Sequence, residues 1–118
     1  MPSPFIDDGY TLEDTIPAVD GRWDDVRIRF RPFTAEEESR VWTRKSINQY
    51  ANMTRLWAEA MVGDGARAPA RLLSWDLKRE SGETVEITAD NLCRLAPQFF
   101  EAILQRLNST IVVERTKN

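Results

Sequence analysis

The sequence predicts an α+β fold, in which a β-hairpin, a long helix, a second β-hairpin and a C-terminal pair of helices follow one another. Residues 26–30 and 73–77 alternate apolar and polar side chains with a period of two, as half-buried strands do. Between them, residues 34–37 read Thr-Ala-Glu-Glu, the capping-box pattern that begins a helix. Beyond the second alternating stretch, apolar residues recur at helical spacing as far as Leu107.

Length and composition fit one domain over residues 1–118 that buries its own core. Of the 118 residues, 42% are hydrophobic, and four are tryptophan. No apolar run approaches the length of a bilayer span, and the first residues lack the basic and apolar regions of a secretory signal. Cys93 is the only cysteine, so no internal disulfide can form. We therefore expect a cytoplasmic protein that makes no membrane contact.

An irregular arm precedes the first hairpin. Residues 1–9 contain two prolines and a glycine, which interrupt regular structure, and Phe5 and Ile6 are its only apolar anchors. Such an arm can dock on its own domain or on a partner, and the sequence leaves both open. Phe5 and Ile6 are therefore candidate partner contacts.

The first hairpin is expected within residues 10–33. Its turn signal is Asp20-Gly21, and its outgoing strand is the clearest in the chain. The apolar residues of that strand point one way and its arginines the other; the two sets are Val26, Ile28 and Phe30, and Arg27, Arg29 and Arg31.

A long helix is expected from Thr34 to a stop at Gly63-Asp64-Gly65. Apolar and aromatic positions along it fall at helical spacing: Val41, Trp42, Ile47, Tyr50, Trp57 and Met61. We expect Trp42 and Trp57 to lie in the core. Nearly thirty residues is long for a helix in a globular protein, so the pattern leaves a kink or a break open.

The second hairpin can be assigned a register from its pattern alone. Leu73 and Trp75 are expected on one face with Leu77. A three-residue loop, residues 80–82, sets Leu77 opposite Val85, whereas a two-residue loop would set Leu77 opposite a glutamate. The longer loop also places a glycine, residue 82, where the turn needs a positive φ.

Two helices are expected after this hairpin. Thr88 can cap a helix that starts at Ala89, and Pro97 inside the following apolar stripe indicates a break with a second helix starting there. Phe99 and Phe100 cannot share one helix face. We expect these two positions to build core, with the exposure of one of them left open, and Phe100 is therefore a candidate partner contact.

The side chains needed for common catalytic chemistry are missing from the sequence. It contains no histidine, which removes the commonest general base and metal ligand, and one cysteine cannot build a thiolate zinc site. The adjacent carboxylates point in different directions, and no phosphate-binding loop is present. We expect no catalytic residues, no metal and no cofactor, and so no enzyme.

Nucleic-acid binding is an alternative that the arginine strand favours. One basic face formed by Arg27, Arg29 and Arg31 could meet phosphates. Against it, the net charge is −3, and Phe30 faces away from the arginines, whereas stacking surfaces combine aromatic rings and charge on one side. A solvated strand face, paired with the acidic strand before it, explains the same pattern.

The central segment also resembles a known family. Its motifs are Trp75-Asp76-Leu77, Ser81-Gly82-Glu83, Val85-Glu86-Ile87-Thr88, Asn91-Leu92 and Leu95-Ala96-Pro97. With Arg31-Pro32 on a strand and the helix start from Thr34 to Glu37, the region from about residue 26 to 107 resembles small tail-assembly proteins of long-tailed phages and prophages. The resemblance implies a non-enzymatic, chaperone-like factor in the cytoplasm. It implies protein partners such as tail-tube or tape-measure proteins, and carries over no catalytic residues.

Overall fold

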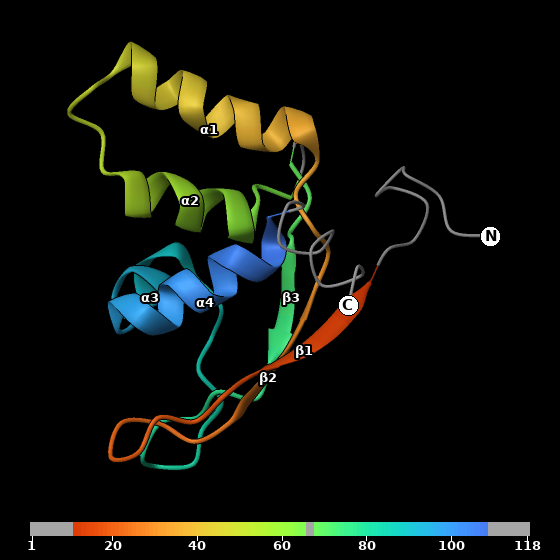
Figure 1. Cartoon of the computed structure of the whole chain (residues 1–118), viewed down its shortest axis with the longest axis vertical. Coiled ribbons are helices and arrows are strands. Elements are labelled where there is room, and N and C mark those ends of the chain that lie inside the picture. The colour runs from red at the N-terminus through yellow and green to blue at the C-terminus, as the bar shows by residue number, and fades with distance from the viewer. Residues whose placement is uncertain (1–10, 66–67, 109–118) are drawn as a thin grey trace.

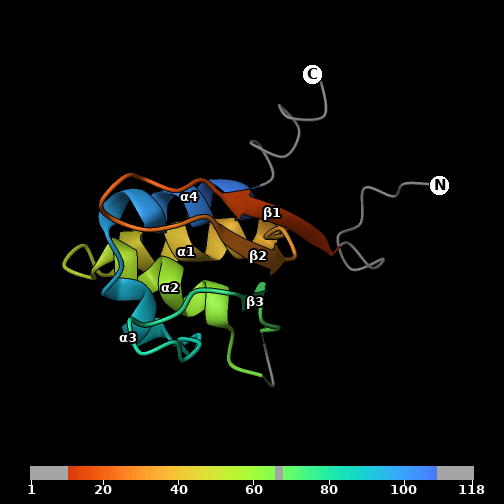
Figure 2. The same cartoon turned by 90° about the horizontal axis from the view of Figure 1, so that it is seen from below.

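The computed structural model describes residues 11–65 and 68–108 of the chain. In this part, three strands form one antiparallel sheet in the order β1-β2-β3, and all four helices lie on the same side of it (Figures 1 and 2). The α+β fold is thus confirmed. The elements are β1 (Leu12–Ile16), β2 (Val26–Phe30), α1 (Ala35–Ile47), α2 (Met53–Val62), β3 (Leu72–Trp75), α3 (Ala89–Cys93) and α4 (Pro97–Leu107).

The first hairpin has the expected turn and facing. β1 pairs with β2 from Leu12 opposite Phe30 to Ile16 opposite Val26. Gly21 has a φ of 74°, a conformation that glycine adopts without steric cost, so the turn lies where Asp20-Gly21 predicts it. Along β2 buried and exposed residues alternate strictly, so its apolar side chains face the helices and its arginines face away.

The helical region after Thr34 is broken into two antiparallel helices. The capping box forms as expected: Glu37 N donates to the Thr34 hydroxyl, and Thr34 N donates to a Glu37 carboxylate oxygen. The helix ends at Ile47, and a second begins at Met53, with the side chain of Asn52 accepting from Arg55 N as its cap. A continuous apolar stripe through residues 47–50 is therefore the wrong interpretation, because the chain turns there.

The second hairpin is shorter than expected, but its turn is confirmed. Lys78 bridges Thr84 and Val85 N donates to Leu77 O, which is the register of the three-residue loop, and Gly82 has a φ of 92°. Residues 85–87 do not form a strand; the main partner of β3 is β2.

Leu73 of β3 faces solvent, whereas its position in the alternating pattern predicts that it faces the core. Leu73 is 40% exposed, whereas Leu72 beside it is 2% exposed. The pairing runs from Arg29 opposite Ser74 to Phe30 opposite Leu72, so Leu73 is the extra residue of a bulge. A bulge shifts the alternation of side chains by one position, and for this reason a strict period of two misplaces Leu73.

The C-terminal helices begin where the sequence indicates. The Thr88 hydroxyl accepts from Asn91 N to cap α3, and Pro97 is the first residue of α4. The exposure left open for Phe100 does not occur, because Phe99 is 3% and Phe100 7% exposed. The buried residues of α4 fall within one sector about 100° wide, which is enough for two adjacent phenylalanines to lie at its two edges. Its buried residues are Phe99, Phe100, Ile103 and Leu107.

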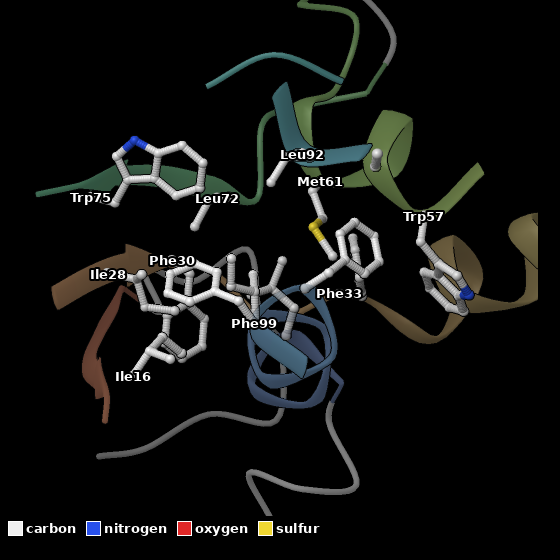
Figure 3. Packing of buried hydrophobic residues seen from close by; sticks show 14 of the residues in the cluster. Ile16, Ile28, Phe30, Phe33, Trp57, Met61, Leu72, Trp75, Leu92 and Phe99 are labelled. Atoms are coloured by element: carbon white, nitrogen blue, oxygen red, sulfur yellow. The ribbon is translucent and has the colours of Figure 1, made fainter. Parts of the chain in front are cut away.

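The core lies between the sheet and the helices. Figure 3 shows side chains of the strands meeting those of α2, α3 and α4. Its members fully removed from solvent include Ile16, Ile28, Phe30, Phe33, Met61, Leu72, Leu92, Ile103 and Leu107. α1 contributes only Val41 to the buried set, so this helix lies at the outside of the molecule (Figure 1).

Candidate interaction surface on the α1–α2 hairpin

The largest exposed apolar side chains of the described residues gather on one structural unit. Trp42 is 59%, Ile47 82% and Tyr50 88% exposed, and all three belong to α1 or to its connection with α2. The other two large exposed apolar residues, Val19 and Leu73, are only 41% and 40% exposed. A single exposed apolar residue is ordinary, but several on one unit mark a candidate interaction surface.

The tip of this hairpin, defined here as Ile47 and Tyr50, is held by a dense set of hydrogen bonds. Tyr50 N donates to the Asn48 side chain at 3.1 Å. Lys45 Nζ donates to the carbonyls of Gln49 and Ala51 at 2.7 and 2.6 Å, and Asn48 N donates to Arg44 O at 3.0 Å. The backbone that presents Ile47 and Tyr50 is therefore fixed, and both side chains point to solvent from an ordered connection.

Trp42 stands beside the tip on another side of α1, and it rests on the core. Its ring meets that of Trp57 edge to face, with centroids 6.2 Å apart and an interplanar angle of 83°. Trp57 in turn contacts Phe33 at a centroid distance of 5.5 Å. Such edge-to-face pairs are favourable beyond the area they bury, so the exposed Trp42 ring is held in a defined position. The expectation that Trp42 is a core residue is wrong, whereas Trp57 is buried as predicted.

One side of α1 presents exposed residues that carry no charge, and the exposed Glu36 lies directly beside them. With 100° per residue, five exposed residues fall within one sector of the helix, which we call the outer face of α1. The charged residues of the helix lie outside this sector. The outer face consists of Ala35, Ser39, Trp42, Thr43 and Ser46.

A groove runs between α1 and α2 on the flank opposite Trp42. Its volume is about 640 Å³, with Val41, Ala60 and Val62 among the apolar residues that line it. Ion pairs lie along its edges: Arg40 contacts Glu36 at 2.8 Å on α1, and Arg44 reaches Glu59 on α2 at 3.2 Å. These pairs are largely exposed, so they contribute little to stability but give the groove a polar rim.

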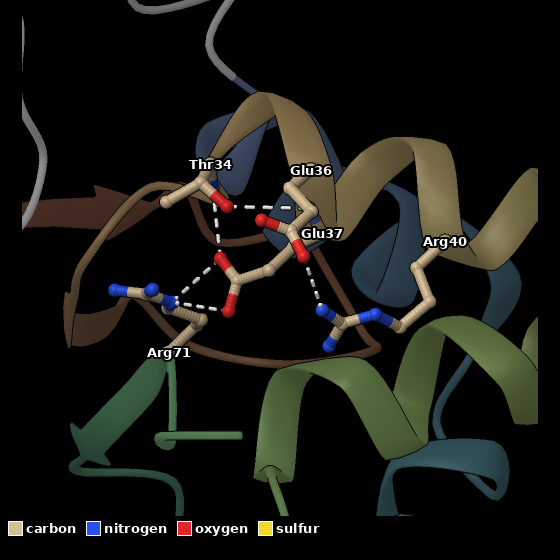
Figure 4. Close-up of polar contacts among 5 residues, drawn as sticks. All are labelled: Thr34, Glu36, Glu37, Arg40 and Arg71. Carbon is tan, nitrogen blue, oxygen red and sulfur yellow. Dashed lines mark hydrogen bonds and ion pairs between the residues drawn. The ribbon is translucent and has the colours of Figure 1, made fainter. Parts of the chain in front are cut away.

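A buried ion pair fixes the start of α1 to the sheet. Arg71 is 2% exposed, and its Nε lies 2.8 and 3.0 Å from the two carboxylate oxygens of Glu37. Figure 4 shows Glu37 turned toward Arg71, while its neighbour Glu36 reaches Arg40. The backbone of Arg71 also bonds Arg31 N and Met61 O. One residue thus ties β2, α1 and α2 together and gives the hairpin a rigid base.

A second ion pair bridges α2 and α3 outside the groove. Arg55 Nη1 lies 2.6 Å from Asp90 Oδ1, and this hydrogen bond raises the pKa of the Arg55 guanidinium. Both side chains are exposed, so the pair positions the helices rather than stabilising them strongly.

The arginine face of the sheet is a weaker candidate. Arg27 and Arg29 are exposed beside a hollow of about 380 Å³, and Arg31 is half-buried past the end of β2. Acidic groups share the hollow: Glu13 lies 3.8 Å from Arg27, and an Asp76 oxygen accepts from Arg27 N. The expectation that this face is paired with the acidic strand before it is confirmed at Arg27. The mixed charge weakens the attraction for phosphates.

The residues proposed from sequence and the surface seen in the structure overlap little. Phe5 and Ile6 lie outside the described residues, and Phe100 is in the core. The helical spacing predicts Ile47 and Tyr50 on the apolar stripe of one long helix, whereas the structure exposes both. The signal that could have found them is Asn48 and Asn52, because asparagines this close inside a helical pattern can end one helix and cap the next.

The described parts of the chain contain neither a metal-binding cluster nor a membrane-spanning helix. No group of three or more Asp, Glu, Cys or His side chains is arranged to hold a metal ion in residues 11–65 and 68–108. Within the same ranges, each helix is too short or too polar to cross a bilayer.

No protein-family model, curated protein or solved structure matches this chain.

Proposed function

We propose that this protein is a non-enzymatic protein–protein interaction factor that binds its partner through the tip of the α1–α2 hairpin. The observation that carries the proposal is the near-complete exposure of Ile47 and Tyr50, 82% and 88%, on a connection held by side-chain and backbone hydrogen bonds. An ordered, exposed pair of apolar side chains loses little conformational freedom when a partner covers it.

The physical gain comes from burying these side chains in the complex. Fully covering one large apolar side chain is worth roughly 1.5–3 kcal/mol. Tyrosine is also a preferred contact residue, because it offers a large rigid ring with a polar end. The groove on the same hairpin offers further apolar space between Val41 and Val62, which a partner large enough to cover both regions can fill.

The resemblance to tail-assembly proteins supplies the partners to test first. We propose a chaperone-like role in the cytoplasm, with tail-tube or tape-measure proteins as the bound class. The resemblance supports this identity of the partner, and the exposed tip supports the mode of binding.

The test is affinity purification of the tagged full chain from its native host, with quantitative mass spectrometry of what co-purifies. The variant carries Ile47→Ser and Tyr50→Ser, and the control carries Leu73→Ser, which removes an exposed apolar side chain from the sheet. We expect the tip variant to recover at least about tenfold less partner, the equivalent of 1.4 kcal/mol, while the control recovers it normally. Equal recovery by wild type and tip variant would refute the proposal.

Nucleic-acid binding through Arg27 and Arg29 is the second candidate, because these two side chains lie exposed on the open side of the sheet. It predicts binding of a short DNA or RNA duplex that weakens steeply as salt is raised. Absence of binding at low salt removes this candidate.

A further inference from the structure

The arginine face of the sheet carries an exposed apolar side chain next to an exposed charge. All four helices of the described residues lie on the other side of the sheet (Figures 1 and 2). Arg29 of β2 lies opposite Ser74, and Leu73 is the bulge residue next to Ser74, so Arg29 and Leu73 are neighbours. Among the described residues, the ion pair on this face joins Glu13 to Arg27 at 3.8 Å, and none involves Arg29. Arg29 and the 40% exposed Leu73 thus offer one cation and one apolar contact to a further segment.

We propose that the N-terminal arm of this chain, residues 1–9, docks on the arginine face, with its acidic pair at Arg29 and its apolar pair over Leu73. The acidic pair is Asp7 and Asp8, and the apolar pair is Phe5 and Ile6. The arm lies outside the described part of the chain, which begins at residue 11. This inference goes beyond the proposed function, because the arginine face is distinct from the tip of the α1–α2 hairpin.

The arm joins the sheet at the end where Arg29 and Leu73 lie. Leu12 is opposite Phe30, and Phe30 is opposite Leu72, so one row across the sheet links the start of β1 to the residue beside Leu73. Neighbouring strands are about 4.8 Å apart, so β3 lies about 10 Å from β1. The acidic and apolar pairs precede Leu12 by four to seven residues, which span about 13–23 Å when extended. Both pairs can therefore reach their proposed contacts.

The order of side chains along the arm matches the order of features across the sheet. Going back from Leu12, the acidic pair comes first and the apolar pair second. Going across the sheet from β1, Arg29 on β2 comes first and Leu73 on β3 second. The arm contains no lysine or arginine, and the first basic residue of the chain is Arg22. Its charge is therefore opposite to that of Arg29, and the two attract each other.

The tether makes a set of weak contacts sufficient. Exposed ion pairs contribute little to stability, and Leu73 is only partly exposed. A segment joined to its site by a few residues, however, meets that site at an effective concentration in the millimolar range. We therefore expect the arm to exchange between a docked and a free state, with the docked state in excess.

Docking changes what the arm and the sheet can bind. Phe5 and Ile6 then contact the chain itself, so they are not the first contacts of another protein. The acidic pair also competes with phosphates for Arg29, which lowers the affinity of the arginine face for nucleic acid. The tip of the α1–α2 hairpin keeps its exposed side chains in both states of the arm.

The test is hydroxyl-radical footprinting of the full chain at low concentration, with the oxidation rate of Leu73 as the readout. Asp7→Lys together with Asp8→Lys sets like charges at Arg29 and is expected to raise the oxidation of Leu73 about threefold. Adding Arg29→Glu to this arm variant makes the charges opposite again. The oxidation of Leu73 is then expected to return to the wild-type rate.

The matched control is Glu80→Lys together with Glu83→Lys, which makes the same change in net charge at two exposed residues of the second hairpin. This control should leave the oxidation of Leu73 unchanged. Trp75 is 7% exposed and should stay protected in every variant, which shows that the sheet remains folded.

Equal oxidation of Leu73 in the wild type and the arm variant overturns the proposal. A rise that Arg29→Glu does not reverse also overturns it, because contact with Arg29 is then not the cause. Protection of Leu73 that grows with protein concentration assigns the face to a second copy instead. Protection lost only on Ile111→Ser with Val113→Ser assigns it to the C-terminal residues. Each of these outcomes leaves the proposed function standing, since that depends on the tip variant.

Discussion

Two regions of the molecule have similar apolar sequence patterns: the sheet together with α4, and the α1–α2 hairpin. The apolar side chains of the first region are buried, whereas several of the second are exposed. On β2 and α4, every apolar residue at a regular spacing is buried, from Val26 at 4% to Ile103 at 0% exposure. On the hairpin, Trp42, Ile47 and Tyr50 share helical spacing and are exposed. Periodicity shows that a segment has an apolar side. It does not show whether the chain itself supplies the surface that covers that side.

The comparison also separates stability from binding. Apolar residues in the sheet and α4 hold the fold together, whereas Trp42, Ile47 and Tyr50 on the outside of the hairpin are exposed to solvent. Substitutions matched in residue type but placed in the two regions therefore test the difference directly.

The largest expected difference is between two isoleucines. Ile103→Ala in α4 leaves a cavity at a fully buried site and should lower the free energy of unfolding by about 4 kcal/mol. Ile47→Ala removes the same atoms from a site that is 82% exposed, and should change the free energy of unfolding by less than about 0.5 kcal/mol. Urea denaturation measures both. A free energy of unfolding lowered by more than about 1.5 kcal/mol for Ile47→Ala is what the loss of a buried side chain would cause. That result would mean that the tip belongs to the core.

The next difference is between two adjacent glutamates of α1. Glu37→Gln leaves Arg71 buried beside a neutral side chain and should lower the free energy of unfolding by about 3–5 kcal/mol, because both partners are largely desolvated. Glu36→Gln breaks an exposed pair with Arg40 and should cost less than about 0.5 kcal/mol. Thermal unfolding of each variant and of the wild type measures both changes in stability. Equal effects would contradict a rigid base for the hairpin.

Local sequence signals account for much of the fold. The capping box at Thr34, the cap at Thr88, the break at Pro97 and the three-residue turn at Gly82 each depend on a few neighbouring residues. For such features the physical cause is contained in the segment itself. The register of the second hairpin can be predicted from the requirement that its apolar side chains share one face, because only one loop length puts Leu77 opposite Val85.

The features missed from sequence depend on contacts between distant segments. Leu73 is exposed because β3 pairs with β2 through a bulge, and Phe100 is buried because the core-facing side of α4 is about 100° wide and includes both phenylalanines. The exposure of Trp42 follows from the outer position of α1, which the turn at Asn48 produces. The candidate surface was therefore beyond the sequence patterns, although two asparagines marked the break that creates it.

The most direct test of the account is hydroxyl-radical footprinting of the full chain, alone and with the partner recovered from its host. This method reports the solvent access of individual side chains. In the free chain at low concentration, Tyr50 and Trp42 should be oxidised readily and Trp75 should be protected, in line with exposures of 88%, 59% and 7%. In the complex, protection of Tyr50 with an unchanged Leu73 is the predicted result. Protection confined to the sheet face beside Arg27 and Arg29, with Tyr50 still oxidised, would contradict the account.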